Sequence, residues 1–528
     1  MATIRSRRSA AWRGASLAAL LLCGAAPAAL AAPADAAKLQ SMQAQLDAMR
    51  AELNAMRTTA QADARITAMQ AQLDAMAGQL AELKTAQEAS DSEIATLKLP
   101  PAPTAVTVTL ANGRPTFATN DGRFTANIRT IMMLDAGKYF QDGDLPAAVP
   151  GRDLGEGTNF RRARLGLDGK LFTDFDYAFI YEFGGSGAEE SGRLYEASLT
   201  YTALRPFRIK VGAFEPNIGL AAAVSTSQMP LMERPAPAEI ARNVAAGDSR
   251  IALQVMGNGS FGGGDSGLAS RWFFSTAVTG NTILAAQTFD EQTGWIGRAV
   301  LAPFSGPAWQ AHVGVNYQYV IHPNDAGPAA TPRYAAQLRD RPELRIDGTR
   351  LIDTGAIDAR HITVLGLEGG FGAGPFLIEG EWFRYDIDRR NTGAATPPDP
   401  RFGGWYVQTA WVLTGENRPY NAAEARFDAP RPTYNFSPTT GAWGAVEVAA
   451  RYSVADLNYR AGAAGAPVLG AVRGGEQKVI SLGANWYLNP TMRLMLDYQH
   501  VDIDRLSAAG AQIGQEYDAL AGRMQVSF

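Results

Sequence analysis

Positively charged side chains recur at alternate positions in several segments of this sequence. Arg162, Arg164 and Lys170 share one parity in the stretch RRARLGLDGKL, and Arg208 and Lys210 do so in FRIKV. Guanidinium and ammonium groups hold anions through charge-assisted hydrogen bonds. A row of such groups on one face of an element therefore indicates binding of anions rather than a covalent reaction.

Other kinds of chemistry have little support in the residues. The four histidines are scattered without the spacing of metal ligands, so we expect no metal and no cofactor. The stretch GNGSFG at 257–262 matches the dinucleotide fingerprint, but no amphipathic helix follows, and we interpret it as a turn. His500 with Asp502 or Asp504 is the only local pairing that resembles part of a hydrolase triad. We therefore expect no enzyme.

The elements that carry the cations alternate with a period of two, which indicates β-strands. Five aromatic residues between Phe175 and Phe183 share one face, and Asp176 and Glu182 lie on the other. Strands of about ten residues with one apolar and one polar face are typical of transmembrane β-barrels. A secreted β-sandwich is the competing fold, but it needs no regular rhythm of long and short loops.

The segments with this pattern number sixteen and predict an all-β barrel of antiparallel strands over residues 123–528. Long and short connections alternate between them, as in outer-membrane barrels; the gaps at 258–269 and 416–442 break this rhythm, and the second is either a long turn or a miscounted pair of strands. The chain ends in Phe528, on the apolar face of its last strand. The predicted strands are 123–136, 159–171, 174–184, 193–202, 206–214, 249–257, 270–279, 293–302, 308–320, 361–371, 375–386, 403–415, 443–455, 476–488, 491–502 and 518–528.

The N-terminal region has a different character. Residues 1–31 combine arginines, an apolar run and a small-residue tail, which predicts a secretory signal peptide. Residues 38–98 carry a heptad-like apolar seam and predict a periplasmic coiled-coil helix, with a single helix or a helical hairpin as the alternative. We interpret 99–122, which opens with LPPAP, as a Pro-rich linker and lead-in. The formal net charge of −4 argues against a nucleic-acid partner.

Several segments, in order along the chain, resemble the phosphate-selective porin O/P family. They include NFRRARLGLDGKLFTDFDYAFIYEF, RIKVGAFEP, LMERP, GRAVLAPF, EWFRYDIDRRN, GWYVQTAWVLTGENRPYN, WGAVEVAARYSVADLN and NWYLNPTMRLMLDYQHVDIDR. The resemblance covers roughly residues 105–528. It implies a sixteen-stranded, trimeric outer-membrane channel that passes anions, typified by phosphate.

Within such a barrel, charged residues should face the lumen, because an arginine or lysine facing lipid at midplane costs about 2–4 kcal/mol. The loop 215–248 is the best candidate for a constriction that folds into the lumen. Arg161 has the lipid-facing parity, at the extracellular end of its strand. The candidate anion-binding and pore-lining residues are Arg129, Arg162, Arg164, Lys170, Arg208, Lys210, Arg234, Arg242, Arg298, Arg451 and Arg493, with Arg523 of the same parity.

The sequence thus predicts a passive outer-membrane porin for small anions, in contact with lipid and assembled as a homotrimer. Lumen acids such as Asp168, Asp176, Glu182, Glu379 and Glu381 could instead pair with these cations, which would give a general diffusion porin of low charge selectivity. A further alternative is a tethering protein whose segment 38–98 binds peptidoglycan or a periplasmic partner.

Overall fold

A computed structural model gives the fold of the chain, which divides into two compact units, residues 1–102 and 103–528. The predicted signal peptide, residues 1–31, lies outside the described residues. The structure describes residues 33–56, 63–97, 105–111, 113–185, 192–262, 269–283, 289–306, 308–390 and 397–528.

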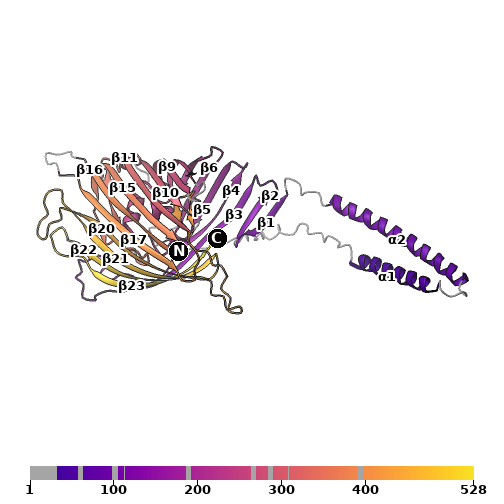
Figure 1. Ribbon diagram of the computed structural model, residues 1–528. Helices are drawn as coiled ribbons and strands as arrows, with labels where there is room; N and C mark the ends of the chain where they lie inside the picture. Colours follow the sequence, from indigo (N-terminus) through magenta and orange to yellow (C-terminus); the bar gives the residue numbers. More distant parts are fainter. Residues whose placement is uncertain are drawn as a thin grey trace, which may run out of the picture. The chain divides into compact units, whose positions relative to one another are not determined.

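Sixteen antiparallel strands form a closed barrel in the second unit (Figure 1). The barrel closes where the last strand pairs with the first, with Ser527 opposite Ile131. Closure leaves no open sheet edge, which is the condition for a sheet to cross lipid. Each predicted segment overlaps one of these strands, so the predicted barrel is confirmed. The strands are β3 (Thr125–Phe140), β4 (Gly157–Leu171), β5 (Phe175–Glu182), β6 (Arg193–Tyr201), β7 (Phe207–Phe214), β8 (Arg250–Gly262), β9 (Ala269–Thr282), β10 (Thr293–Ser305), β11 (Trp309–His322), β15 (Ile357–Ala373), β16 (Phe376–Arg389), β17 (Arg401–Val412), β20 (Ala445–Tyr459), β21 (Val472–Tyr487), β22 (Met492–Asp504) and β23 (Glu516–Ser527).

The outer surface of the barrel carries the apolar side chains of the alternating pattern. On β5, Phe179 is 56% exposed, whereas its neighbour Ile180 is 1% exposed and Glu182 is buried. Phe183, just after this strand, is 63% exposed. Aromatic residues of this parity therefore face outward, and the charged residues between them face the interior.

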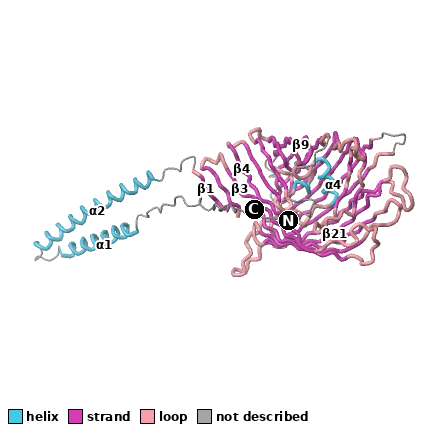
Figure 2. The backbone as a smooth tube through the Cα atoms, turned by 180° about the vertical axis from the view of Figure 1, so that it is seen from behind, coloured by secondary structure: helices cyan, strands magenta, loops and turns pink. Residues whose placement is uncertain are grey.

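The long loop between β7 and β8 folds into the interior of the barrel. It contains two helices, α3 (Leu220–Ala223) and α4 (Ala236–Ala245), and Figure 2 shows α4 within the ring of strands. Ile240 of α4 belongs to a hydrophobic cluster with Ile296 and Phe383 of the barrel wall. α4 contacts β10, β11, β15, β16, β17 and β20, so it lies against that side of the wall.

Two other long connections also fold over or into the lumen. The loop between β11 and β15 carries the short strands β12 (Ala335–Ala336), β13 (Arg339–Asp340) and β14 (Ile352–Asp353). The connection between β17 and β20 is a long turn at the end of the barrel where most connections are short, and it contains the hairpin β18 (Tyr420–Asn421) and β19 (Arg426–Phe427). Phe427 packs against Leu377 of the wall, so this segment is anchored inside the barrel rather than being a pair of wall strands.

Part of the region interpreted as a lead-in forms a hairpin, β1 (Val106–Ala111) and β2 (Arg114–Thr119). β2 pairs with β3 through Thr116 and Asn127, beyond the point where β23 ends. The first residues of β3 would otherwise present an unpaired edge at this point, and the hairpin covers it.

The first unit consists of α1 (Pro33–Met56) and α2 (Asp63–Leu97), which lie side by side (Figure 1). Leu46 and Leu73 of the two helices are buried against each other. This arrangement corresponds to the helical-hairpin alternative, and a coiled coil with a partner helix remains a prediction. Among the described helices, each is too short or too polar to cross a membrane.

Candidate functional site

Three cavities of about 300 Å³ or more are lined by described residues inside the barrel, and we name them by position. The outer cavity, of about 300 Å³, is lined by Arg162, Arg193 and the loop that carries β13. The middle cavity, of about 370 Å³, is lined by residues of β3 to β8, including Arg164 and Lys210. The inner cavity, of about 400 Å³, lies at the short-turn end beside β22 and the C-terminal Phe528.

The outer cavity is strongly cationic. Its described lining residues include nine arginines but only three carboxylates, those of Glu239, Asp248 and Asp340. Side chains of like charge this close together attract a counter-ion. The arginines are Arg161, Arg162, Arg193, Arg242, Arg250, Arg339, Arg341, Arg345 and Arg350.

Arg242 of α4 separates the outer cavity from the middle one. Its guanidinium Nε lies 3.3 Å from Glu215 and 3.2 Å from Glu239, and Nη2 lies 3.0 Å from Asp248. Arg242 lines the outer cavity and Glu215 the middle one. One buried arginine therefore ties the start, the helix and the end of the 215–248 loop together, and it links the linings of the two cavities.

In the middle cavity most cations have a carboxylate partner. Lys210 Nζ lies 2.7 Å from Glu196. Arg164 Nε lies 2.6 Å from Glu182, and its guanidinium stands over the ring of Tyr195 at 3.4 Å from the centroid. Six cations and four carboxylates line this cavity, so a positive excess remains: Arg129, Arg164, Arg208, Lys210, Arg234 and Arg426 against Asp176, Glu196, Glu215 and Glu424.

The inner cavity continues the row of arginines. Arg129 and Arg426 line both the middle and the inner cavity, so the two spaces adjoin at these side chains. Among the described residues that line the inner cavity there are five arginines and no aspartate or glutamate. They are Arg114, Arg129, Arg426, Arg431 and Arg493.

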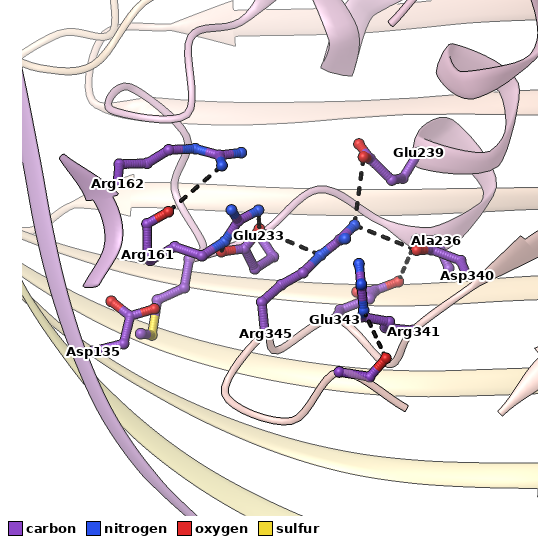
Figure 3. Close-up of polar contacts among 12 residues, drawn as sticks. Asp135, Arg161, Arg162, Glu233, Ala236, Glu239, Asp340, Arg341, Glu343 and Arg345 are labelled. Carbon is purple, nitrogen blue, oxygen red and sulfur yellow. Dashed lines mark hydrogen bonds and ion pairs between the residues drawn. The ribbon is translucent and has the colours of Figure 1, made fainter. Parts of the chain in front are cut away.

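Figure 3 shows how the loop between β11 and β15 is fixed to the 215–248 loop. Arg345 Nη2 lies 3.4 Å from Glu239 and 3.3 Å from Asp340, and its Nε lies 3.8 Å from Glu233. Burial favours the neutral form of Glu239, but the guanidiniums of Arg242 and Arg345 outweigh it and lower the pKa of Glu239 to about 2. Burial dominates at Asp340, where it raises the pKa to about 7.

A β-bulge explains why Arg161 and Arg162 both face the interior. Along β3 the register passes from Met133 opposite Arg162 to Leu134 opposite Phe160, so Arg161 is the extra residue. A bulge of this kind re-aims one side chain. Arg161 is 3% exposed, and its Nε lies 2.7 Å from Glu233, so the lipid-facing position expected from strict alternation does not hold.

Four of the predicted lumen cations are held in ion pairs and do not line the three cavities. Arg298 Nη2 lies 2.7 Å from Glu368, and both side chains are fully buried. Arg451 binds Glu343 of the loop that carries β13. Arg523 Nε lies 2.7 Å from Asp135, and Lys170 Nζ, at the short-turn end, lies 2.6 Å from Asp176. In this structure they brace the wall and its loops.

The remaining predicted residues lie along the cavities. Arg234 lines the middle cavity and donates from Nη2 to the carbonyl of Val224 at 2.8 Å, which fixes the turn after α3. Arg493 lines the inner cavity and donates to the carbonyl of Met229 at 2.8 Å. Arg129, Arg162, Arg164, Arg208, Lys210 and Arg242 also line a cavity.

Sequence reasoning missed the arginines that loops bring into the lumen. Arg426 and Arg431 belong to the long turn between β17 and β20, and Arg114 belongs to the β1–β2 hairpin. The loop between β11 and β15 supplies four more to the outer cavity. The density of arginine in RYAAQLRDRPELRIDGTR, at 333–350, was the available signal for those four: Arg339, Arg341, Arg345 and Arg350.

The closed barrel with charged cavities along its interior defines a porin, a channel protein of the outer membrane. The chain belongs to the phosphate-selective porin O and P family, whose model matches residues 137–528. It is 28% identical to Porin O of Pseudomonas aeruginosa over 394 residues, which are 70% of this chain and 82% of that protein. An uncharacterized protein of Caulobacter vibrioides is 27% identical over 427 residues, 76% of each chain. Proteins of this family are channels rather than enzymes.

Solved outer-membrane barrels resemble this one at low sequence identity. OmpT of Vibrio cholerae aligns with a TM-score of 0.43 at 7% identity, over 77% of this chain and 98% of that one. The outer-membrane channel DcaP of Acinetobacter baumannii aligns with a TM-score of 0.40 at 11% identity, over 78% and 99% of the two chains. Among the described residues, no group of three histidine, cysteine or acidic side chains is placed to hold a metal ion.

Proposed function

We propose that the chain is a passive channel for small anions, phosphate among them. The observation that carries the proposal is the segregation of charge. The whole chain has a formal net charge of −4, yet the described lining of each cavity has an excess of cations. A pore lined with arginine and lysine concentrates anions and excludes cations of the same size.

The same residues give anions a stepwise path. A cation about 4 Å from an anion is worth roughly 4 kcal/mol at an effective dielectric constant near 20. Arg162 and Arg164 are two positions apart on β4, and they line the outer and middle cavities in turn. The guanidinium of Arg129, at the next junction, has no hydrogen-bond or ion-pair partner within the described part of the chain. In the outer and middle cavities, neighbouring carboxylates weaken anion binding enough for release.

Family membership and strand length both support assembly as a homotrimer. β5 and β7 have 8 residues each, below the about 9–11 that a strand needs to span lipid, and β6 has 9, at the lower limit. This low section of wall is suited to contact with a neighbouring subunit rather than with lipid. Covalent cross-linking of the purified protein should give a trimer, and a monomer band alone would contradict this proposal.

The long loops would then face the outside of the cell and the short turns the periplasm, as in other barrels. The β1–β2 hairpin lies at the short-turn end of the barrel, where β3 begins, and α1 and α2 come before this hairpin in the chain. This order supports a periplasmic position for residues 38–98. There they could bind peptidoglycan or a periplasmic partner. Deleting 38–98 and measuring envelope attachment tests this role separately from permeation.

Single-channel recording in planar bilayers tests the proposed function. Under a KCl gradient the reversal potential should have the sign of chloride permeation, and replacing chloride by phosphate should reduce the current without abolishing it. Arg129→Gln should shift the reversal potential toward zero, whereas Arg401→Gln, at an exposed surface position, should not. A wild-type reversal potential near zero would instead indicate a general diffusion porin of low charge selectivity.

A further inference from the structure

The long turn between β17 and β20 lies at the short-turn end of the barrel. It brings the carboxylate of Glu424 into the middle cavity. The tip of this turn, residues 423–426, is held by its backbone. Arg298 donates from Nη1 to the carbonyl of Glu424 at 3.1 Å and from Nη2 to the carbonyl of Ala425 at 2.8 Å. Arg426 donates to the carbonyl of Ala223 in α3 at 2.5 Å. The position of the tip therefore does not depend on the Glu424 side chain.

The carboxylate of Glu424 accepts hydrogen bonds from two side-chain donors that could also bind an oxyanion. Arg208 donates from Nη2 to Oε1 at 3.0 Å, and Asn217 donates from Nδ2 to Oε2 at 3.0 Å. Glu424 lines the middle cavity with Arg208 and Asn217, and its side chain is 32% exposed, so solvent and small solutes reach this contact.

Arg208 retains a donor that the carboxylate does not use. Its Nε is buried and has no hydrogen-bond partner among the described residues. Nε and Nη2 lie on the same edge of a guanidinium, the edge that binds oxyanions with two parallel hydrogen bonds. Glu424 engages only Nη2 of that edge, and Nη2 also donates to the carbonyl of Ala423. A tetrahedral oxyanion that accepted from both Nε and Nη2 would make one more hydrogen bond to Arg208 than the carboxylate makes.

We propose that Arg208 and Asn217 form a binding subsite for tetrahedral oxyanions, and that Glu424 occupies it as a tethered competitor when no such anion is bound. This inference rests on the proposed anion channel and specifies one of its binding sites. An arriving oxyanion displaces the carboxylate from Arg208, and the displaced carboxylate then repels the bound anion. The tether thereby limits residence time, which a channel requires at every site along its path.

The other carboxylates of the middle cavity do not have this arrangement. Glu196 is on β6 and accepts a hydrogen bond of 2.7 Å from Lys210 of the adjacent strand β7. The hydroxyl of Ser198 also donates to the Glu196 carboxylate, at 2.7 Å. Glu215 is 15% exposed and pairs with Arg242. Of the four described carboxylates in this cavity, Glu424 is the one that a loop brings from the short-turn end to an arginine of the opposite wall.

The test measures how phosphate reduces the chloride current of single channels formed by the full-length protein. In Glu424→Gln the phosphate concentration for half-maximal reduction should fall about tenfold or more, because the competing charge is gone. In Arg208→Gln it should rise about tenfold. Glu416→Gln removes the same charge from the same turn, outside the three cavities, and should match the wild type.

Glu424→Asp provides a second measurement in case the glutamine variant gives no channels. The shorter side chain keeps the charge but withdraws from Arg208, so the half-maximal phosphate concentration should fall about threefold. An unchanged or higher value in either Glu424 variant would overturn the tethered-competitor proposal. Failure of the channel proposal itself would look different: the wild type would show a reversal potential near zero and no reduction of current by phosphate.

Discussion

Replacing Arg242 by glutamine removes the cation that holds the 215–248 loop in place. Arg242 is 4% exposed and lies within 3.3 Å of three carboxylates, those of Glu215, Glu239 and Asp248. Glutamine has a similar length but carries no charge, so these acids would face one another without a shared counter-charge. Arg345 and Arg193 would remain beside Glu239 and Asp248 respectively.

The size of the effect follows from the burial of the site. Removing one partner of a buried ion pair typically costs about 3–5 kcal/mol, because the other charge is left without compensation. A cost of this size corresponds to a more than hundredfold shift in the equilibrium between the folded-in loop and an open one. The loop should therefore leave the lumen for part of the time, and the space beside Arg242, between the outer and middle cavities, should widen.

Single-channel recording in planar bilayers measures the consequence. Arg242→Gln should give a larger conductance, more frequent transitions between levels and a reversal potential closer to zero in a KCl gradient. The matched control is Arg401→Gln, because the Arg401 side chain is 63% exposed and lies outside the three cavities. This variant should behave as the wild type. If Arg242→Gln kept the wild-type conductance and selectivity, the loop would be held by its apolar packing, and the reasoning about its ion pairs would be refuted.

Three further predictions concern pH, a buried pair and the N-terminal unit. Burial raises the pKa of Asp340 to about 7 from 3.8, so this carboxyl is neutral below pH 7 and adds a negative charge to the lining of the outer cavity above pH 7; anion conductance measured from pH 5.5 to 8.5 should therefore fall as pH rises through 7, and Asp340→Asn should remove that change. Glu368→Gln leaves the fully buried Arg298 without its carboxylate and should lower the free energy of unfolding, measured by urea titration, by about 3–5 kcal/mol. An unchanged free energy of unfolding would show that His312 and backbone carbonyls are sufficient partners for Arg298. Deleting 38–98 should leave conductance and selectivity unchanged, since the described lining residues all lie beyond Pro103; a changed reversal potential would contradict this.

The barrel could be predicted from the sequence because the physics of each strand is local. Successive side chains on β4 and β5 must alternate between lipid and lumen, so the pattern in RRARLGLDGKLFTDFDYAFIYEF reports the fold directly. The irregular gap at 258–269 shortens to 263–268 in the structure, because β8 extends to Gly262 and β9 begins at Ala269. Polar and glycine residues at these strand ends carry no alternation and so concealed their length.

The lumen could be predicted only in part, because its details depend on contacts between distant residues. Alternation gave the inward direction of Arg298 and Arg451 but not their acids, Glu368 and Glu343, which lie far away in the chain. One bulge turned Arg161 inward against the simple period. The turn that carries Arg426 has no periodic pattern of its own, and its place in the lumen follows from packing against the wall.

The proposed function requires that anions travel along the arginine-lined cavities inside the barrel. Crystals soaked in bromide and measured near the bromine absorption edge would locate monovalent anions directly. We predict anomalous peaks beside Arg162 in the outer cavity, between Arg164 and Lys210 in the middle cavity, and beside Arg129 where the middle and inner cavities adjoin. A lumen without bromide peaks, in crystals that show peaks elsewhere on the protein, would contradict anion passage along these arginines.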